Sequence, residues 1–236
     1  MEQASNGLAY LQDKGIVHCD VKAGNIFIGG SNGSRYLAKI GDFGQAVFEF
    51  GQFSLTQTTS YPDSQTSKEN ERNRVGTVAY AAPELFDIGA KRNVQSDIYS
   101  FAMVMVEFSL PERSHPWEGE IAPCDLIYHH VKEGQRPFVD PEKLRDFPDN
   151  KQDEWLLLIK QCWSHRMNHR PSMKAVSKVL SSMSSTGQKF KSTENYRTNV
   201  HRQHAGVTFQ HVINWSEIQI NRKYWTNVHR QHGGVN

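Results

Sequence analysis

The stretch HCDVKAGN at residues 18–25 constrains this chain most, because it places an acid, a cation and an amide within one short segment. A hydroxyl that attacks a phosphate needs an acceptor for its proton, a cation on the transferring group and oxygen ligands for Mg²⁺. Asp20 suits the first need and Lys22 the second, while Asn25 offers an amide oxygen for the third. The spacing therefore predicts a phosphoryl-transfer site.

A second carboxylate extends this site. Asp42 directly follows Gly41 and the apolar run at residues 37–40, and it precedes Phe43 and Gly44. A strand that ends in a glycine-flanked aspartate presents the carboxylate on a tight turn, where it could hold a metal ion that bridges two phosphates. The Mg²⁺ ligands are therefore expected to come from this turn and from the preceding segment.

Three motifs occur in a fixed order: HxDxKxxN at 18–25, DFG at 42–44 and APE at 82–84. They resemble the catalytic loop, the metal loop and the end of the activation segment of a eukaryotic protein kinase. The segments SDIYSF at 96–101 and HRPS at 169–172 resemble later parts of the same domain. The resemblance implies a mainly α (α+β) fold, namely the large, C-terminal lobe of a protein kinase with small β hairpins at the catalytic cleft.

The resemblance covers residues 1–183 and also implies a small N-terminal lobe that grips ATP. Neither a glycine-rich loop nor a strand lysine for the phosphates occurs among residues 1–17. We therefore expect the large lobe alone, with the small N-terminal lobe missing. Two alternatives to an active kinase stay open: a non-catalytic module that binds partners through its helices, and a truncated gene product.

The resemblance gives each matched site residue a role. Asp20 orients the substrate hydroxyl and accepts its proton, and Lys22 stabilises the γ-phosphoryl group. Asn25 and Asp42 hold Mg²⁺, so the implied cofactors are ATP and Mg²⁺. Phe27 corresponds to the apolar floor under adenine.

Other matched residues have implied structural roles, and they are His18, Phe43, Thr77, Glu84, Asp97 and Arg170. Among these, Asp97 is expected to hold the backbone of the catalytic loop, and Glu84 is expected to pair with Arg170. His18 is expected to pack behind Phe43 and not to act as a base.

Finer features indicate the type of kinase. Lys22 and the GTxxY sequence at 76–80, in which the Thr77 hydroxyl can bridge the catalytic aspartate and lysine, resemble serine/threonine kinases. The Pro-Trp pair at 116–117 and the Cys-Trp pair at 162–163 resemble the tyrosine-kinase-like branch of that group. The implied reaction transfers the γ-phosphate of ATP to hydroxyl groups of a protein substrate.

One departure from the family pattern lies inside the catalytic loop. Cys19 occupies the position at which many protein kinases have an arginine that gathers the phosphate of a phosphorylated activation loop. Without that guanidinium, such a phosphate loses one bidentate partner. We therefore expect that phosphorylation between Phe43 and Thr77 is not a strict on-switch.

Composition narrows the class of protein and its partners. The chain has 236 residues, of which 37% are apolar, and this suffices for one sizeable buried core. Its net charge of +2 creates no strong field for nucleic acid, so no nucleic-acid partner is expected. The expected protein substrate is what the kinase resemblance implies. Nothing in the sequence predicts an oligomeric state.

The cysteines and the apolar runs bear on the compartment. Cys19, Cys124 and Cys162 are odd in number and lack CxxC spacing, which favours reduced thiols. The first residues form no signal peptide, and the longest apolar run, at 101–106, is too short to span a bilayer. We therefore expect a cytoplasmic or nuclear setting and no membrane segment.

Apolar spacing predicts the regular elements. A helix is expected to end before Gly15, and residues 26–28 and 37–40 are expected to form a strand pair. Residues 51–74, rich in serine and threonine, are expected to form a mobile loop. Further helices are expected around the apolar repeats at 98–108, 126–131, 155–159 and 173–180.

Residues 184–236 differ from the rest of the chain. They hold 7 basic and 2 acidic residues, whereas residues 1–183 hold 20 and 23. Residues 196–207 reappear at 224–235 with 10 of 12 positions identical and a period of 28. We expect a disordered basic tail. The repeated HRQH sequences also suggest metal or anion binding, and a duplicated coding segment is the further alternative.

Overall fold

The computed structural model describes residues 1–29, 37–49, 78–109, 115–117, 124–144 and 151–184. Three predictions fall outside these ranges: the loop at 51–74, the position of Thr77, and the tail from residue 185 onward with its 28-residue repeat.

The described residues form a helix-rich fold with two small strand pairs. The α-helices are α1 (Glu2–Asp13), α3 (Val94–Ser109), α4 (Cys124–Lys132), α5 (Gln152–Cys162) and α6 (Met173–Ser184). The strands are β1 (Ile16–Val17), β2 (Ile26–Gly29), β3 (Leu37–Ile40) and β4 (Val47–Phe48). Short 3₁₀ turns lie at Ala23–Asn25, Phe43–Gln45, Pro83–Phe86, Pro141–Leu144 and Met167–His169. The helices and the β2–β3 pair confirm the predictions made from apolar spacing.

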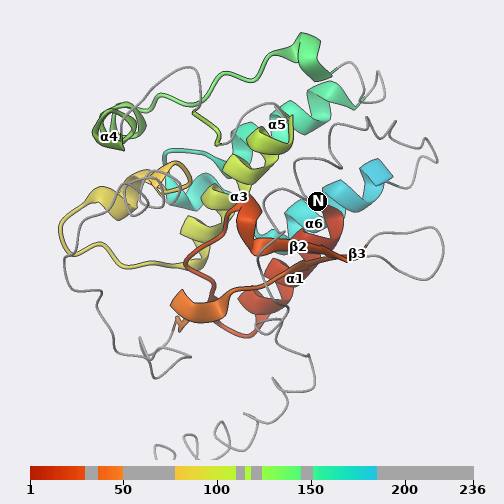
Figure 1. Cartoon of the computed structure of the whole chain (residues 1–236), viewed down its shortest axis with the longest axis horizontal. Coiled ribbons are helices and arrows are strands. Elements are labelled where there is room, and N and C mark those ends of the chain that lie inside the picture. Colours follow the sequence, from red (N-terminus) through yellow and green to blue (C-terminus); the bar gives the residue numbers. More distant parts are fainter. Residues whose placement is uncertain (30–36, 50–77, 110–114, 118–123, 145–150, 185–236) are drawn as a thin grey trace, which may run out of the picture.

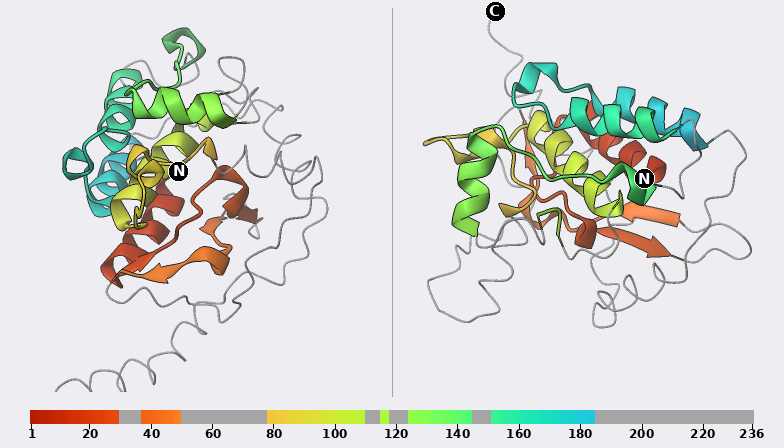
Figure 2. Two further views of the ribbon diagram at one scale, coloured as in Figure 1. Left: turned by 90° about the vertical axis from the view of Figure 1, so that its left-hand side faces the viewer. Right: turned by 90° about the horizontal axis from the view of Figure 1, so that it is seen from above.

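Both strand pairs are antiparallel. In the predicted pair, Ile26 lies opposite Ile40 and Gly29 opposite Leu37. In the second pair, β1 lies beside β4, and the sequence did not predict it because each strand is only two residues long. Both views of Figure 2 show the red and orange strands on one side of the fold and most of the green to blue helices on the other.

Helix α3 runs through the middle of the core, between α5 and the strands (Figure 1). Its start is fixed by a reciprocal cap: the side chain of Asn93 accepts from the Ser96 N–H at 3.0 Å, and the Ser96 hydroxyl accepts from the Asn93 N–H at 3.2 Å. Most of its residues are buried, as expected of a helix covered nearly all round, although Phe108 is partly exposed. This cap places Asp97 in the first turn.

Helix α1 leads the chain into the catalytic loop. Its buried face carries Ala4, Leu8 and Leu11, and it packs against α6 and β3. Gly15 ends the helix with a φ of 66°, a left-handed conformation that suits glycine. The chain then passes through β1 directly to His18.

Candidate active site

The structure brings Asp20, Lys22 and Asn25 together. Lys22 Nζ lies 2.7 Å from Asp20 Oδ2. Asn25 Nδ2 donates to the same oxygen at 2.9 Å and to the backbone carbonyl of Asp20 at 2.7 Å. Both contacts of Asn25 use its amide nitrogen, so its amide oxygen is the atom that could bind a cation. The carboxylate of Asp20 is thus held between a cation and an amide.

The loop that carries Asp20 is anchored to α3. Asp97 accepts hydrogen bonds from the backbone N–H of His18 at 2.6 Å and from that of Cys19 at 3.0 Å. Burial raises the pKa of Asp97 to about 7, while these two N–H groups favour its ionised form. The contact expected between Asp97 and the catalytic-loop backbone is therefore present.

Two non-glycine residues in the described part of the chain have positive φ angles, and both adjoin the site. The values are 68° for Cys19 and 60° for Asp42. Left-handed backbone is disfavoured for residues that carry a Cβ, and it tends to persist at functional sites. At Asp42 the side-chain oxygen Oδ1 accepts from the N–H of Gly44 at 3.3 Å, which supports the turn.

Gly41 connects the turn that carries Asp42 to the catalytic loop. Its N–H donates to the carbonyl of Asn25 at 2.9 Å, and its own carbonyl lies 2.9 Å from His18 Nε2. A Cβ at residue 41 would lie 2.7 Å from Cε2 of Phe27, closer than real Cβ atoms approach. Glycine therefore lets the half-buried ring of Phe27 lie against the backbone that leads to Asp42.

His18 is buried beneath the site. Its ring packs against Phe43, with the ring centroids 5.1 Å apart. Burial is the main cause that lowers the pKa of His18, so its imidazole is neutral. A proton on Nε2 lets the ring donate to the Gly41 carbonyl, and Nδ1 then faces the backbone N–H of Asp20 at 3.4 Å.

We expect His18 to stay neutral, with its proton on Nε2, as the pH falls through 6.5, the ordinary pKa of histidine. The second ring proton, which would charge the imidazole, binds more readily to the unfolded chain than to the folded chain. His18 therefore lowers the stability of the folded chain below that pH. Asp97 acts in the opposite direction, since its raised pKa makes the folded chain the better proton acceptor between pH 3.8 and about 7. Histidine-detected NMR isolates His18, and a His18 signal that titrates at 6.5 would contradict the assignment.

Glu84 and Arg170 form the predicted pair. Nη1 and Nη2 of Arg170 each donate to one carboxylate oxygen of Glu84, both at 2.7 Å. Arg170 also donates to the backbone carbonyls of Ser164 at 2.8 Å and Gln95 at 2.9 Å. Its guanidinium lies 5.2 Å from the ring centroid of Tyr99. The pair therefore connects the turn at Pro83–Phe86 with α3 and with the segment before α6.

The sequence motifs missed one residue that acts on the backbone of the site, and they gave Gly41 only as the residue that precedes Asp42. Arg92 donates from Nη1 to the backbone carbonyl of Cys19, and Gly41 links the two loops as described above. Arg92 stands in a polar turn between two elements, so nothing in its sequence context indicates the contact. The contacts of Gly41 were not indicated either, because a glycine has no side chain to mark them. Thr77 lies outside the described residues, so its expected bridging role stays a prediction.

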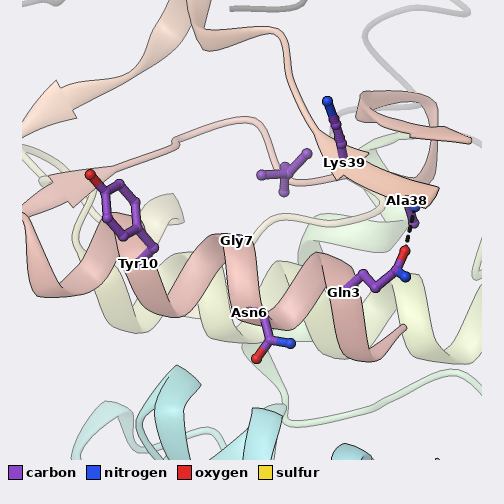
Figure 3. Close-up of a pocket in the computed structure, with 7 residues that line it drawn as sticks. Gln3, Asn6, Gly7, Tyr10, Ala38 and Lys39 are labelled. Atoms are coloured by element: carbon purple, nitrogen blue, oxygen red, sulfur yellow. Dashed lines mark hydrogen bonds between the residues drawn. The ribbon is translucent and has the colours of Figure 1, made fainter. Parts of the chain in front are cut away.

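A pocket of about 390 Å³ lies between α1 and β3 (Figure 3). It is lined by Gln3, Asn6, Gly7, Tyr10, Ala38, Lys39 and Ile40. At one end the side-chain oxygen of Gln3 accepts from the backbone N–H of Ala38 at 2.5 Å. None of the candidate catalytic or Mg²⁺-binding residues lines this pocket.

Neither a membrane-spanning helix nor a cluster of metal ligands occurs in the part of the chain that the structure describes. Within that part, no helix is both long and apolar enough to cross a membrane. Nor does that part contain a group of three or more His, Cys, Asp or Glu side chains arranged to hold a metal ion. The HRQH repeats, with their suggested metal or anion binding, lie outside the described residues.

Comparisons with known proteins agree with this geometry. A model of the protein kinase domain matches residues 1–180. Human receptor-interacting serine/threonine-protein kinase 1 is 31% identical over 171 residues, which are 72% of this chain and 23% of that protein. The EPD1-interacting receptor-like cytoplasmic serine/threonine-protein kinase 5D of Gossypium barbadense is 30% identical over 78% of this chain and 38% of its own length. The light-sensor protein kinase of Ceratodon purpureus is 28% identical over 75% of this chain and 13% of its own length.

The chain thus spans less than two fifths of the length of each of these relatives but is itself matched over most of its length. Two of the three relatives are named as serine/threonine kinases. Together with the site geometry, these matches show that the chain belongs to the protein kinase domain family and resembles its serine/threonine kinases.

Proposed function

We propose that this chain supplies the phosphoryl-transfer site of a serine/threonine protein kinase, which moves the γ-phosphate of ATP to a hydroxyl of a protein substrate. The observation that supports this most is that Lys22 and Asn25 both contact the carboxylate of Asp20, beside the turn that presents Asp42. Family membership gives the same reaction class.

Asp20 and Lys22 have complementary roles in this proposal. The carboxylate of Asp20 orients the substrate hydroxyl and accepts its proton. Lys22 Nζ, now 2.7 Å from that carboxylate, would also stabilise the negative charge of the transferred phosphoryl group. The side chains are 13% exposed for Asp20 and 31% exposed for Lys22, so both can be reached from solvent.

Asn25 and Asp42 are the proposed Mg²⁺ ligands, and Phe27 is the proposed floor under adenine. An amide oxygen and a carboxylate are hard oxygen donors, which suit Mg²⁺, and the remaining ligands would be phosphate oxygens and water. When bound, Mg²⁺ neutralises charge on the phosphates. Phe27 offers a half-buried aromatic surface next to the Asp42 turn.

We further propose that residues 1–183 correspond to the large lobe of a kinase domain and that residues 184–236 form a separate basic tail. In this assignment Asp97 fixes the backbone of the catalytic loop, and His18 packs behind Phe43. The segment that receives the substrate is shaped by Glu84, Arg170 and Thr77. The observed pairing of Glu84 with Arg170 supports this assignment.

The test is binding of Mg-ATP by the chain, measured as a rise in melting temperature. At a concentration of about 100 times the dissociation constant, binding adds about 2.7 kcal/mol to the stability of the folded state, roughly 5–10 °C for a domain of this size. The rise should require Mg²⁺, and Asp42→Asn should remove most of the part that depends on Mg²⁺. A melting temperature that Mg-ATP leaves unchanged would favour the non-catalytic binding module.

A further inference from the structure

The backbone around Cys19 is held from two sides. On one side, Asp97 accepts from the N–H groups of His18 and Cys19. On the other side, the guanidinium of Arg92 donates to the carbonyl of Cys19. Between these contacts, Cys19 adopts a φ of 68°, a conformation that a residue with a Cβ rarely takes without support.

Both supporting residues come from the start of α3. Asn93 caps this helix together with Ser96, so the cap fixes Arg92 just before the helix and Asp97 in its first turn. The positive charge of Arg92 also counteracts the burial that disfavours ionised Asp97. One helix start therefore presents a cation to the carbonyl of Cys19 and an anion to the neighbouring N–H groups.

We propose that Arg92 is a positioning residue: together with Asp97 it holds Cys19 in the left-handed conformation and thereby aims the next side chain, that of Asp20. A change of φ and ψ at Cys19 would change the direction of the chain at the next residue. It would therefore displace the carboxylate of Asp20 from its contact with Lys22. We call the contacts of Arg92 and Asp97 with the backbone of His18 and Cys19 the backbone clamp. The consequence for catalysis rests on the proposed function, whereas the backbone clamp does not.

Arginine suits this task better than lysine. Its planar guanidinium presents several N–H donors in fixed directions and stays charged, while a lysine ammonium is a single mobile point. Arg92 and its neighbour Lys91 are both exposed cations, so Lys91 provides a control with the same charge. Replacing Arg92 should remove the hydrogen bond to the Cys19 carbonyl, whereas replacing Lys91 should leave that bond in place.

The thiols report on the backbone clamp directly. Cys19 is only 9% exposed and Cys162 is 0% exposed, and burial raises the pKa of each thiol to about 12. In the full chain, alkylation by iodoacetamide, followed by mass spectrometry of each cysteine peptide, measures opening at both places. In Arg92→Gln we expect iodoacetamide to alkylate Cys19 roughly tenfold faster, as the loss of a charge-assisted hydrogen bond implies. Because Arg92 also lowers the pKa of this thiol, losing its charge alone would slow alkylation, so a faster rate reports opening of the loop.

The controls separate a local effect from unfolding. Cys162 should keep its wild-type rate in Arg92→Gln, Arg92→Lys should recover part of the protection at Cys19, and Lys91→Gln should behave as the wild type. An unchanged rate at Cys19 in Arg92→Gln would overturn the proposal. So would equal increases at both cysteines, because the contact would then stabilise the whole domain and not the loop.

A kinetic readout links the backbone clamp to catalysis. In the full-length protein, Arg92→Gln should lower kcat for phosphate transfer while leaving KM for ATP close to the wild-type value, and Arg92→Lys should restore part of kcat. If the wild type transfers no phosphate and yet Cys19 is protected by Arg92, the proposed function fails and the backbone clamp stands. If transfer occurs and kcat is the same with and without Arg92, the positioning role fails.

Discussion

Asp20→Asn is expected to remove phosphate transfer from the full-length protein while leaving it folded. Asparagine has the size of aspartate and can still accept a hydrogen bond from Asn25 Nδ2, but it has no charge for Lys22 and cannot take up a proton. The loss of a general base lowers such rates about a hundredfold to ten-thousandfold. Incorporation of labelled phosphate from Mg-ATP into a protein substrate measures it.

A matched control distinguishes this loss from a change in overall charge. Asp13 is an exposed aspartate at the end of α1, and Asp13→Asn should transfer phosphate at the wild-type rate. The rise in melting temperature caused by Mg-ATP should also survive in Asp20→Asn, because Asn25 and Asp42 are the proposed Mg²⁺ ligands. Undiminished transfer by Asp20→Asn would refute the role of this carboxylate.

Local patterns predicted much of the candidate site. The residues of HCDVKAGN are close in the chain, so a short loop closed by the Asn25 contacts brings the three side chains together. The helices were predictable because each buries one apolar face or, as in α3, nearly all of its surface. The DFG and APE motifs added order along the chain, from which the resemblance gave the long-range pairing of Glu84 with Arg170.

Contacts between distant segments were harder to predict. The β1–β4 pair joins two strands of two residues each, which is too short for an alternation of apolar residues to be recognised. The contact of Arg92 with the Cys19 carbonyl spans 73 positions of sequence and ends on a backbone atom. Because any residue offers a carbonyl, no side-chain pattern at residue 19 indicates such a partner.

The largest loss of stability is expected from breaking the buried pair of Glu84 and Arg170. In Glu84→Ala the guanidinium of Arg170, whose side chain is 0% exposed, remains charged without its carboxylate. Arg136 lies 5.1 Å from the centroid of the same Tyr99 ring. Burial lowers the pKa of Arg136, Arg170 lowers it further and Glu84 raises it, so the repulsion between the two cations loses its compensating anion in this variant. An uncompensated buried charge costs about 3–5 kcal/mol, roughly 6–20 °C in melting temperature.

An exposed ion pair between the end of α4 and the residue that follows the same turn provides the comparison. Lys132 pairs with Asp87, whose side chain is 61% exposed, and such exposed pairs contribute little to stability because solvent and salt screen them. Thermal unfolding of Lys132→Ala should therefore stay within a few degrees of the wild type, far from the result for Glu84→Ala. The double variant Glu84→Ala with Arg170→Met should recover part of the loss, because it removes the stranded charge as well. If Glu84→Ala melts no lower than Lys132→Ala, the pair does not stabilise the turn at Pro83–Phe86, and that turn must be fixed by its packing against α4.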